Sequence, residues 1–123
     1  MGVVDACHTE YGATGTPIVT PLTCSLDGQE ISVQLAPSTR LRDIYGVDTV
    51  VESTTCNYGL NPDFGHLVAA GLVLAGADGT GEVRAVERSD HPFFVATLYQ
   101  PQLRSTAARP HPVFGAFVAA VAG

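Results

Sequence analysis

The chain has 123 residues, of which 46% are hydrophobic and 15% are charged, and its formal net charge is -6. This length allows one domain with a buried core, because chains of this size bury roughly two thirds of their unfolded surface. All six basic residues are Arg and they form no basic stripe, so we expect no nucleic-acid partner.

Neither a membrane segment nor a secretion signal is expected. The longest apolar run, residues 66–77, is interrupted by Gly and is shorter than the roughly 20 residues that span a bilayer. The first ten residues lack the charged start and the apolar core of a signal peptide. We therefore expect a cytoplasmic protein.

The cysteines and histidines give no sign of a metal site or a cofactor. Cys7, Cys24 and Cys56 form no Cys-x-x-Cys pair and leave an odd thiol over, which argues against a disulfide framework and a thiolate zinc site. The four histidines have no metal-ligand spacing. The glycines of residues 79–81 precede no helix, as a phosphate loop would require. Free thiols, no metal and no cofactor are expected.

The first third of the chain predicts a loop and then a hairpin. Residues 1–16 contain Gly, Thr and Pro without hydrophobic periodicity, which indicates a loop. Residues 17–26 and 31–35 are predicted as strands. The Asp27-Gly28 pair between them is a common hairpin turn.

Two helices and a strand are predicted in the middle of the chain. A short helix is capped by Ser38 and ended by Gly46, and residues 47–55 follow as a strand. The Asn-Pro-Asp sequence at residues 61–63 is a helix start, because Asn caps, Pro fits the first helical position and Asp favours the helix dipole. Gly71 ends this helix.

The last half predicts three strands and a C-terminal helix. Residues 72–77 and 82–88 are strands around a Gly-rich turn. Residues 93–99 form a nearly continuous apolar run that suits a strand buried on both faces of a mixed sheet. Residues 113–121 form a helix rich in Ala and Phe, and the His111-Pro112 pair marks its start. The fold class is therefore α/β, but few elements supply the crossovers that begin an open α/β domain.

Several blocks of the chain resemble one family in order and spacing. They are DACHTEY (5–11), VVESTTCNYGLNPDF (50–64), AAGLVLAG (69–76), EVRAVERSDHPFFVA (82–96) and RPHPVFGAFVAA (109–120). Together they resemble class I glutamine amidotransferase domains, most closely the C-terminal glutaminase domain of CTP synthase and the CTP synthase C-terminal region-related proteins. The resemblance implies the C-terminal half of a flavodoxin-like domain, with a mixed sheet and flanking helices. Residues 1–123 would then be a partial domain that lacks the N-terminal half and its nucleophile elbow.

The resemblance also implies that the catalytic positions are altered. The family strand ends in His-Pro-Glu, where the His is the general base for a Cys nucleophile and the Glu orients it; here the tripeptide is Gln100-Pro101-Gln102. Glutamine has no protonation equilibrium near neutral pH and cannot transfer that proton. The family's carboxylate-binding Arg aligns with Asn57, beside Tyr58, and Asn offers neither charge nor a bidentate fork. No Gly-x-Cys-x-Gly elbow occurs in this chain.

Each of these residues also has an interpretation without function. Gln100 and Gln102 would be ordinary polar residues at a strand end. Cys56 would be a small buried hydrophobe, although the resemblance places it beside the former substrate pocket.

Three functional hypotheses follow. The first is a degenerate glutaminase-like domain without glutamine hydrolysis, which binds glutamine or a related small molecule or regulates a partner. The second is part of an active amidotransferase that supplies ammonia for CTP synthesis and whose N-terminal half is missing here. The third is a thiol or redox protein that uses Cys56. A sheet without its first strands exposes an edge and apolar faces, so a homo-oligomer or pairing with the missing half-domain is expected.

Overall fold

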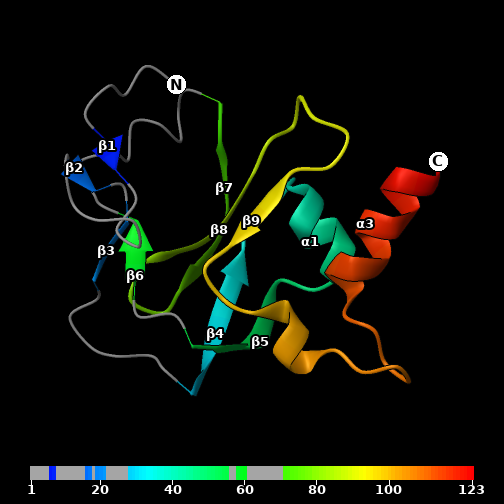
Figure 1. Cartoon of the computed structure of the whole chain (residues 1–123), viewed down its shortest axis with the longest axis horizontal. Coiled ribbons are helices and arrows are strands. Elements are labelled where there is room, and N and C mark those ends of the chain that lie inside the picture. Colours follow the sequence, from blue (N-terminus) through cyan, green and yellow to red (C-terminus); the bar gives the residue numbers. More distant parts are fainter. Residues whose placement is uncertain (1–5, 8–15, 18, 22–27, 56–57, 61–70) are drawn as a thin grey trace.

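A five-stranded antiparallel sheet organises the chain (Figure 1). In this computed structural model, the described residues are 6–7, 16–17, 19–21, 28–55, 58–60 and 71–123. The strand order is β5-β4-β7-β8-β9. The strands are β4 (Gln29–Leu35), β5 (Thr49–Thr54), β7 (Val73–Asp78), β8 (Val83–Glu87) and β9 (Val95–Thr97).

Four short strands form two further pairs. β1 (Ala6–Cys7) and β2 (Thr16–Pro17) are parallel, whereas β3 (Val19–Pro21) and β6 (Tyr58–Leu60) are antiparallel. The predicted loop over residues 1–16 lies largely outside the described residues, as does the predicted helix that starts at residues 61–63.

The predicted hairpin across Asp27-Gly28 is wrong. β4 pairs with β5 and β7, and β3 pairs with β6 instead. The Gly28 N–H donates to the Thr54 carbonyl at 3.0 Å, which joins the start of β4 to the end of β5. The Asp-Gly turn signal therefore did not determine the partners of β4. This strand lies inside the sheet, between β5 and β7, where its apolar face is buried.

Strict alternation along β4 builds the core. Ile31, Val33 and Leu35 are buried, and the residues between them are exposed. This period of two is what a strand with one covered face requires. The remaining core residues come from α1, α3, β7, β8 and the segment after β9: Leu41, Val113, Ala75, Ala85 and Tyr99.

β9 and the residues after it curl the sheet. β9 lies at the sheet edge and is only partly buried, so the prediction of a strand buried on both faces is wrong. Beyond it, the Leu98 N–H donates to the Arg84 carbonyl at 2.8 Å and the Gln100 N–H donates to the Ser53 carbonyl at 3.1 Å. Residues 98–100 thus form hydrogen bonds with both β8 and β5, two strands that are not neighbours in the sheet.

Helix α1 (Arg40–Tyr45) begins one residue later than predicted. Its N-cap is Thr39, whose hydroxyl accepts the Arg42 N–H at 3.2 Å. Ser38, the predicted cap, instead has a φ of 63°. The predicted end at Gly46 is confirmed, because this residue has a left-handed φ of 75° and donates to the Arg42 carbonyl.

The buried carboxylate of Glu87 ties α1 to the sheet. It accepts the N–H groups of Arg40 at 2.9 Å and Leu41 at 3.1 Å. These are amides of the first helical turn, which have no partner within the helix. The carboxylate of this β8 residue therefore accepts hydrogen bonds that water would otherwise accept at the start of α1.

The chain closes with a short 3-10 helix and the predicted C-terminal helix. The 3-10 helix η3 (Pro101–Arg104) was not predicted, whereas α3 (Pro112–Ala122) was. His111 is the N-cap of α3, and its Nδ1 accepts the Val113 N–H at 3.1 Å. Within the described ranges, no helix is both long enough and apolar enough to cross a bilayer.

Two glycine substitutions should shift stability in opposite directions. Gly76→Ala would place a Cβ 2.8 Å from Val33 Cγ1, and we expect the free energy of unfolding to fall by about 1–3 kcal/mol from overpacking. Gly115→Ala meets no described atom within 4 Å, and it should raise that free energy by about 1 kcal/mol because Gly disfavours helix. Urea denaturation measures both. A Gly76→Ala variant as stable as the unmodified chain would contradict the packing around Gly76, and a destabilised Gly115→Ala variant would contradict the open surroundings of Gly115.

Candidate functional site

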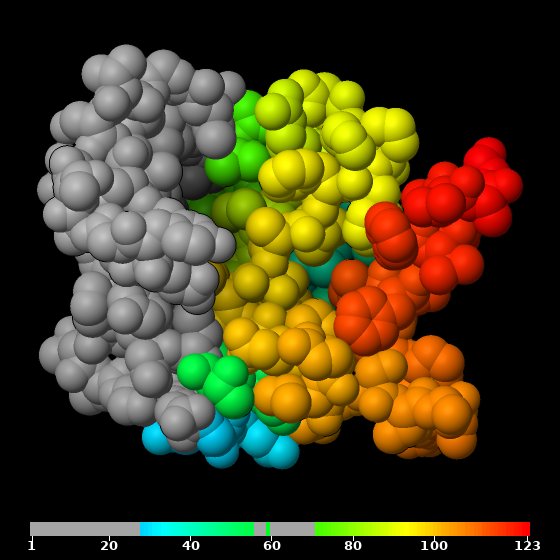
Figure 2. Space-filling view, in the orientation of Figure 1, coloured from blue at the N-terminus to red at the C-terminus, as the bar shows by residue number. Residues whose placement is uncertain are grey.

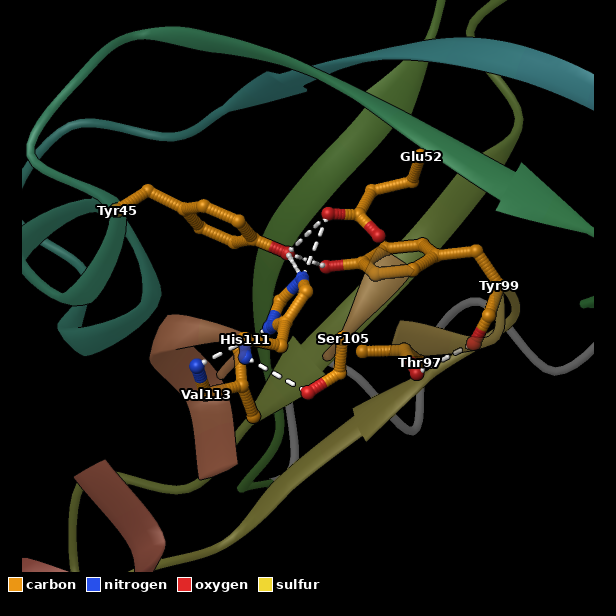
Figure 3. Close-up of polar contacts among 7 residues, drawn as sticks. All are labelled: Tyr45, Glu52, Thr97, Tyr99, Ser105, His111 and Val113. Carbon is orange, nitrogen blue, oxygen red and sulfur yellow. Dashed lines mark hydrogen bonds and ion pairs between the residues drawn. The ribbon is translucent and has the colours of Figure 1, made fainter. Parts of the chain in front are cut away.

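Three buried polar side chains and the half-buried Tyr45 meet between α1, the sheet and the start of α3 (Figure 3). We call Tyr45, Glu52, Tyr99 and His111 the Glu52 cluster. Glu52 Oε1 accepts the Tyr45 hydroxyl at 3.0 Å and lies 2.7 Å from His111 Nε2. The hydroxyls of Tyr45 and Tyr99 are 3.0 Å apart. One carboxylate oxygen therefore joins three separate segments of the chain.

The hydrogen bonds fix the tautomer of His111. Its Nδ1 accepts the Val113 N–H, so that nitrogen carries no proton. The ring proton is then on Nε2, which donates it to Glu52 Oε1. Because Tyr45 donates to Glu52, Tyr99 is left as the donor to the Tyr45 oxygen. The cluster is a continuous chain of donors that ends on Glu52.

Glu52 reaches this position because of the alternation in β5. Glu52 and Thr54 are buried, whereas Thr49 and Val51 are exposed. An acid at an inward position is costly unless donors surround it. The sequence signal was a lone Glu within the predicted strand 47–55, and it was missed because the donors come from distant segments.

Burial keeps both phenols protonated. Burial, followed by Tyr99 and Glu52, raises the pKa of Tyr45 well above its ordinary value. Burial also raises the pKa of Tyr99 from 10.0 to about 12, with the Glu52 charge acting in the same direction and the Tyr45 hydrogen bond opposing it. Glu52 Oε2 is buried and has no hydrogen-bond partner among the described residues. Both phenols of the cluster are therefore neutral near neutral pH.

Gln100 follows the cluster directly and is bound to the end of β5. Its side-chain Oε1 accepts the Thr55 N–H at 2.7 Å, and its backbone N–H donates to the Ser53 carbonyl. Gln100 is half-buried, whereas Gln102 is exposed on η3. The two predicted positions therefore differ: one side chain braces the backbone, and the other faces solvent.

The structure brings Gln100 to the segment that precedes the other predicted site residues. Thr55 is followed by Cys56 and Asn57, which lie outside the described residues. Tyr58 is described only as a backbone position of β6, paired with Pro21. Among the described residues, no group of three or more His, Cys, Asp or Glu side chains could hold a metal ion.

Comparison with solved structures identifies the class of fold. The glutaminase domain of Trypanosoma brucei CTPS, solved with bound acivicin, matches with a TM-score of 0.83 and 28% identity over 96% of this chain and 51% of that chain. A structure assigned to a GMP synthase protein of Thermoplasma acidophilum matches in fold, with a TM-score of 0.63 and 18% identity over 85% of this chain and 48% of that one. The chain has the class I glutamine amidotransferase fold.

Sequence comparison names the relatives. The chain is 33% identical to the CTP synthase of Caulobacter vibrioides (strain NA1000 / CB15N) and 32% identical to that of Phenylobacterium zucineum (strain HLK1), each over 97% of its own length. It is a homologue of CTP synthase with the fold of the glutaminase domain. It spans about a quarter of these curated relatives, 25% and 26%. No protein-family model matches the chain.

Alkaline pH should destabilise the fold through the cluster. Because the pKa of Tyr99 is raised in the folded state, the unfolded chain loses this proton first, at about pH 10. The contribution of the buried phenol is therefore complete below pH 10 and is lost as the pH rises toward about 12. Urea denaturation between these values should show a falling free energy of unfolding.

The variant Tyr99→Phe isolates this effect. It removes one titrating group, so its free energy of unfolding should fall less steeply with pH than that of the unmodified chain. The variant also loses the hydrogen bond of the Tyr99 hydroxyl. Comparing how the free energy of unfolding changes with pH in the two proteins, and not its absolute value, removes this constant difference. Identical slopes in the two proteins would show that Tyr99 does not titrate as a buried phenol.

Proposed function

We propose that this chain is a partial glutaminase-type domain that does not hydrolyse glutamine and that acts in binding or regulation. Residues 1–123 would be the C-terminal half of such a domain, since they match 51% of the Trypanosoma brucei glutaminase chain. The ligand would be glutamine or a related small molecule. The homology to CTP synthase supports the amidotransferase relation, and the loss of hydrolysis is our proposal.

The observation that carries this proposal is the state of Gln100. Its amide oxygen is held by the Thr55 N–H at 2.7 Å, at the position where the family resemblance would place the general base. An amide offers no proton acceptor comparable to imidazole at neutral pH. Gln102, in the position of the orienting acid, is exposed and carries no charge to polarise a base. The strand end is built as a brace and lacks the groups for proton transfer.

A second candidate is part of an active amidotransferase. It is favoured by the coverage, because about three quarters of each curated CTP synthase lies outside the matched region. The nucleophile and a replacement base would then come from other residues, and the ammonia would serve CTP synthesis. A redox role for Cys56 stays a prediction from the sequence, since that residue lies outside the described part of the chain.

Ammonia release from L-glutamine tests the proposal. The purified chain should release no more ammonia than a blank without protein, because neither Gln100 nor Gln102 can move the proton that acyl transfer needs. Full-length Caulobacter vibrioides CTP synthase, assayed in parallel, controls for the detection of ammonia. Ligand-observed NMR with L-glutamine, and with D-glutamine as the matched control, measures binding in the same samples.

Two results would count against this account. Saturable ammonia release by the chain would contradict the loss of hydrolysis. If Cys56→Ala abolished that release, it would assign the nucleophile to Cys56. Absence of both hydrolysis and L-glutamine binding would remove glutamine as the ligand and leave a regulatory role.

A further inference from the structure

Two histidines bond in the same way to the backbone that follows them. In residues 91–93 and in residues 111–113, both of which read His-Pro and then an apolar residue, the histidine Nδ1 accepts the N–H of the third residue at 3.1 Å. The proline between them has no N–H of its own. The two sites differ in their surroundings, because the His91 ring is exposed and the His111 ring is buried.

The Nδ1 atom of His111 can serve either the helix or a proton, but not both. Val113 lies in the first turn of α3, where N–H groups have no partner within the helix, and Nδ1 is its acceptor. An imidazole nitrogen that gains a proton becomes a donor and can no longer accept. Two N–H groups would then face each other across the 3.1 Å contact, beside a helix start that disfavours positive charge.

The His111 ring is held in place from its other side. Its Nε2 lies 2.7 Å from Glu52 Oε1, and a charged ring binds a carboxylate more strongly than a neutral one. The backbone N–H of His111 donates to Ser105 Oγ at 2.9 Å (Figure 3). The residue is therefore anchored through both its ring and its backbone. When the ring gains a proton, it stays in place and the start of α3 has to move.

Three segments place ionisable side chains against this ring. Glu52 comes from β5, Tyr45 comes from α1 with its hydroxyl 3.3 Å from Nε2, and Tyr99 lies after β9 and bonds to Tyr45. Both phenols stay neutral in acid, because burial raises their pKa. Among the described side chains, Glu52 is the ion-pair partner of His111. It is therefore the group that retains the charged ring.

Helix α3 is fastened to the described part of the chain mainly at its start. Val113 is its buried residue, and Figure 2 shows the later turns of α3 standing clear at one side of the molecule. The ring of Phe117 adds an edge-to-face contact with that of Phe93, with centroids 5.5 Å apart. The cap at Val113 therefore acts at the point where the helix is attached.

We propose that His111 is an acid-sensitive cap, which releases the first turn of α3 when its ring gains a proton. With a neutral ring, Nδ1 caps the helix and Nε2 donates to Glu52. With a charged ring, the bond to Glu52 remains and the bond to Val113 is lost. The change is confined to the start of α3, because the bonds of Tyr45 and Tyr99 do not involve Nδ1. This device does not depend on the proposed function.

An NMR titration of the 123-residue chain tests the proposal between about pH 8 and about pH 5, the range in which imidazole ordinarily changes charge. The 15N shifts of the His111 ring report its protonation. Hydrogen exchange, corrected for the intrinsic effect of pH, reports the protection of the Val113 amide. That protection should fall about 5-fold with the same midpoint as the ring, because a helix N-cap contributes stability of this order. The amides of β4 should keep their protection.

Two variants separate the cap from other effects of acid. His111→Asn keeps a capping oxygen but does not titrate, so the protection of the Val113 amide should be the same at every pH. His91→Asn is the matched control, because it removes the other ring with an Nδ1 bond to the backbone; it should leave the response of Val113 unchanged. If His111→Asn does not fold, the agreement of the two midpoints in the unmodified chain still decides.

Four outcomes would overturn the proposal. One is a Val113 amide that keeps its protection while the His111 ring gains a proton. Another is a ring that stays neutral down to about pH 5. The third is an equal loss of Val113 protection in His111→Asn, which would assign the response to a different titrating group. The fourth is a simultaneous loss of protection in β4, which would mean that acid unfolds the whole chain and does not release one turn.

Discussion

The acceptance of two hydrogen bonds by one oxygen of Glu52 is the constraint on which the rest of this structure depends. The Tyr45 hydroxyl brings α1 to that oxygen and the His111 ring brings the start of α3, while Tyr99 joins through Tyr45. Removing one partner from such a buried network leaves a charge or a donor without compensation, which costs far more than the intact bonds contribute. The cluster therefore fixes the positions of both helices against the sheet.

The cluster also sets the position of Gln100, the residue that follows Tyr99. Tyr99 is held inside, so the next residue, Gln100, is delivered to the end of β5, where Thr55 binds its side chain. The chain thus keeps the curled sheet and strand end of a glutaminase-type fold. In our proposal, that strand end now serves as a structural brace in a domain that binds or regulates. Fold and reaction are separable because few side chains carry the reaction.

Local patterns in the sequence predicted most elements but not their partners. The strand at residues 31–35, the Gly46 stop and the His111-Pro112 start of α3 depend on neighbours in the chain, and each is present as predicted. The hairpin at Asp27-Gly28 failed because pairing is decided by long-range burial. The Glu52 cluster could not be predicted, since its members are separated by up to 66 residues. Gln100 and Gln102 were predicted as site positions only because the chain resembles the family, since no local pattern marks them.

The 15N spectrum of the His111 ring at pH 7 tests the Glu52 cluster most directly. We expect Nε2 to resonate as a protonated nitrogen and Nδ1 as an unprotonated one, because Nδ1 accepts the Val113 N–H and Nε2 donates to Glu52. The variant His111→Asn, which keeps a capping oxygen, assigns the signals among the four histidines by their disappearance. A proton on Nδ1, whether in the other tautomer or in imidazolium, would contradict the proposed arrangement.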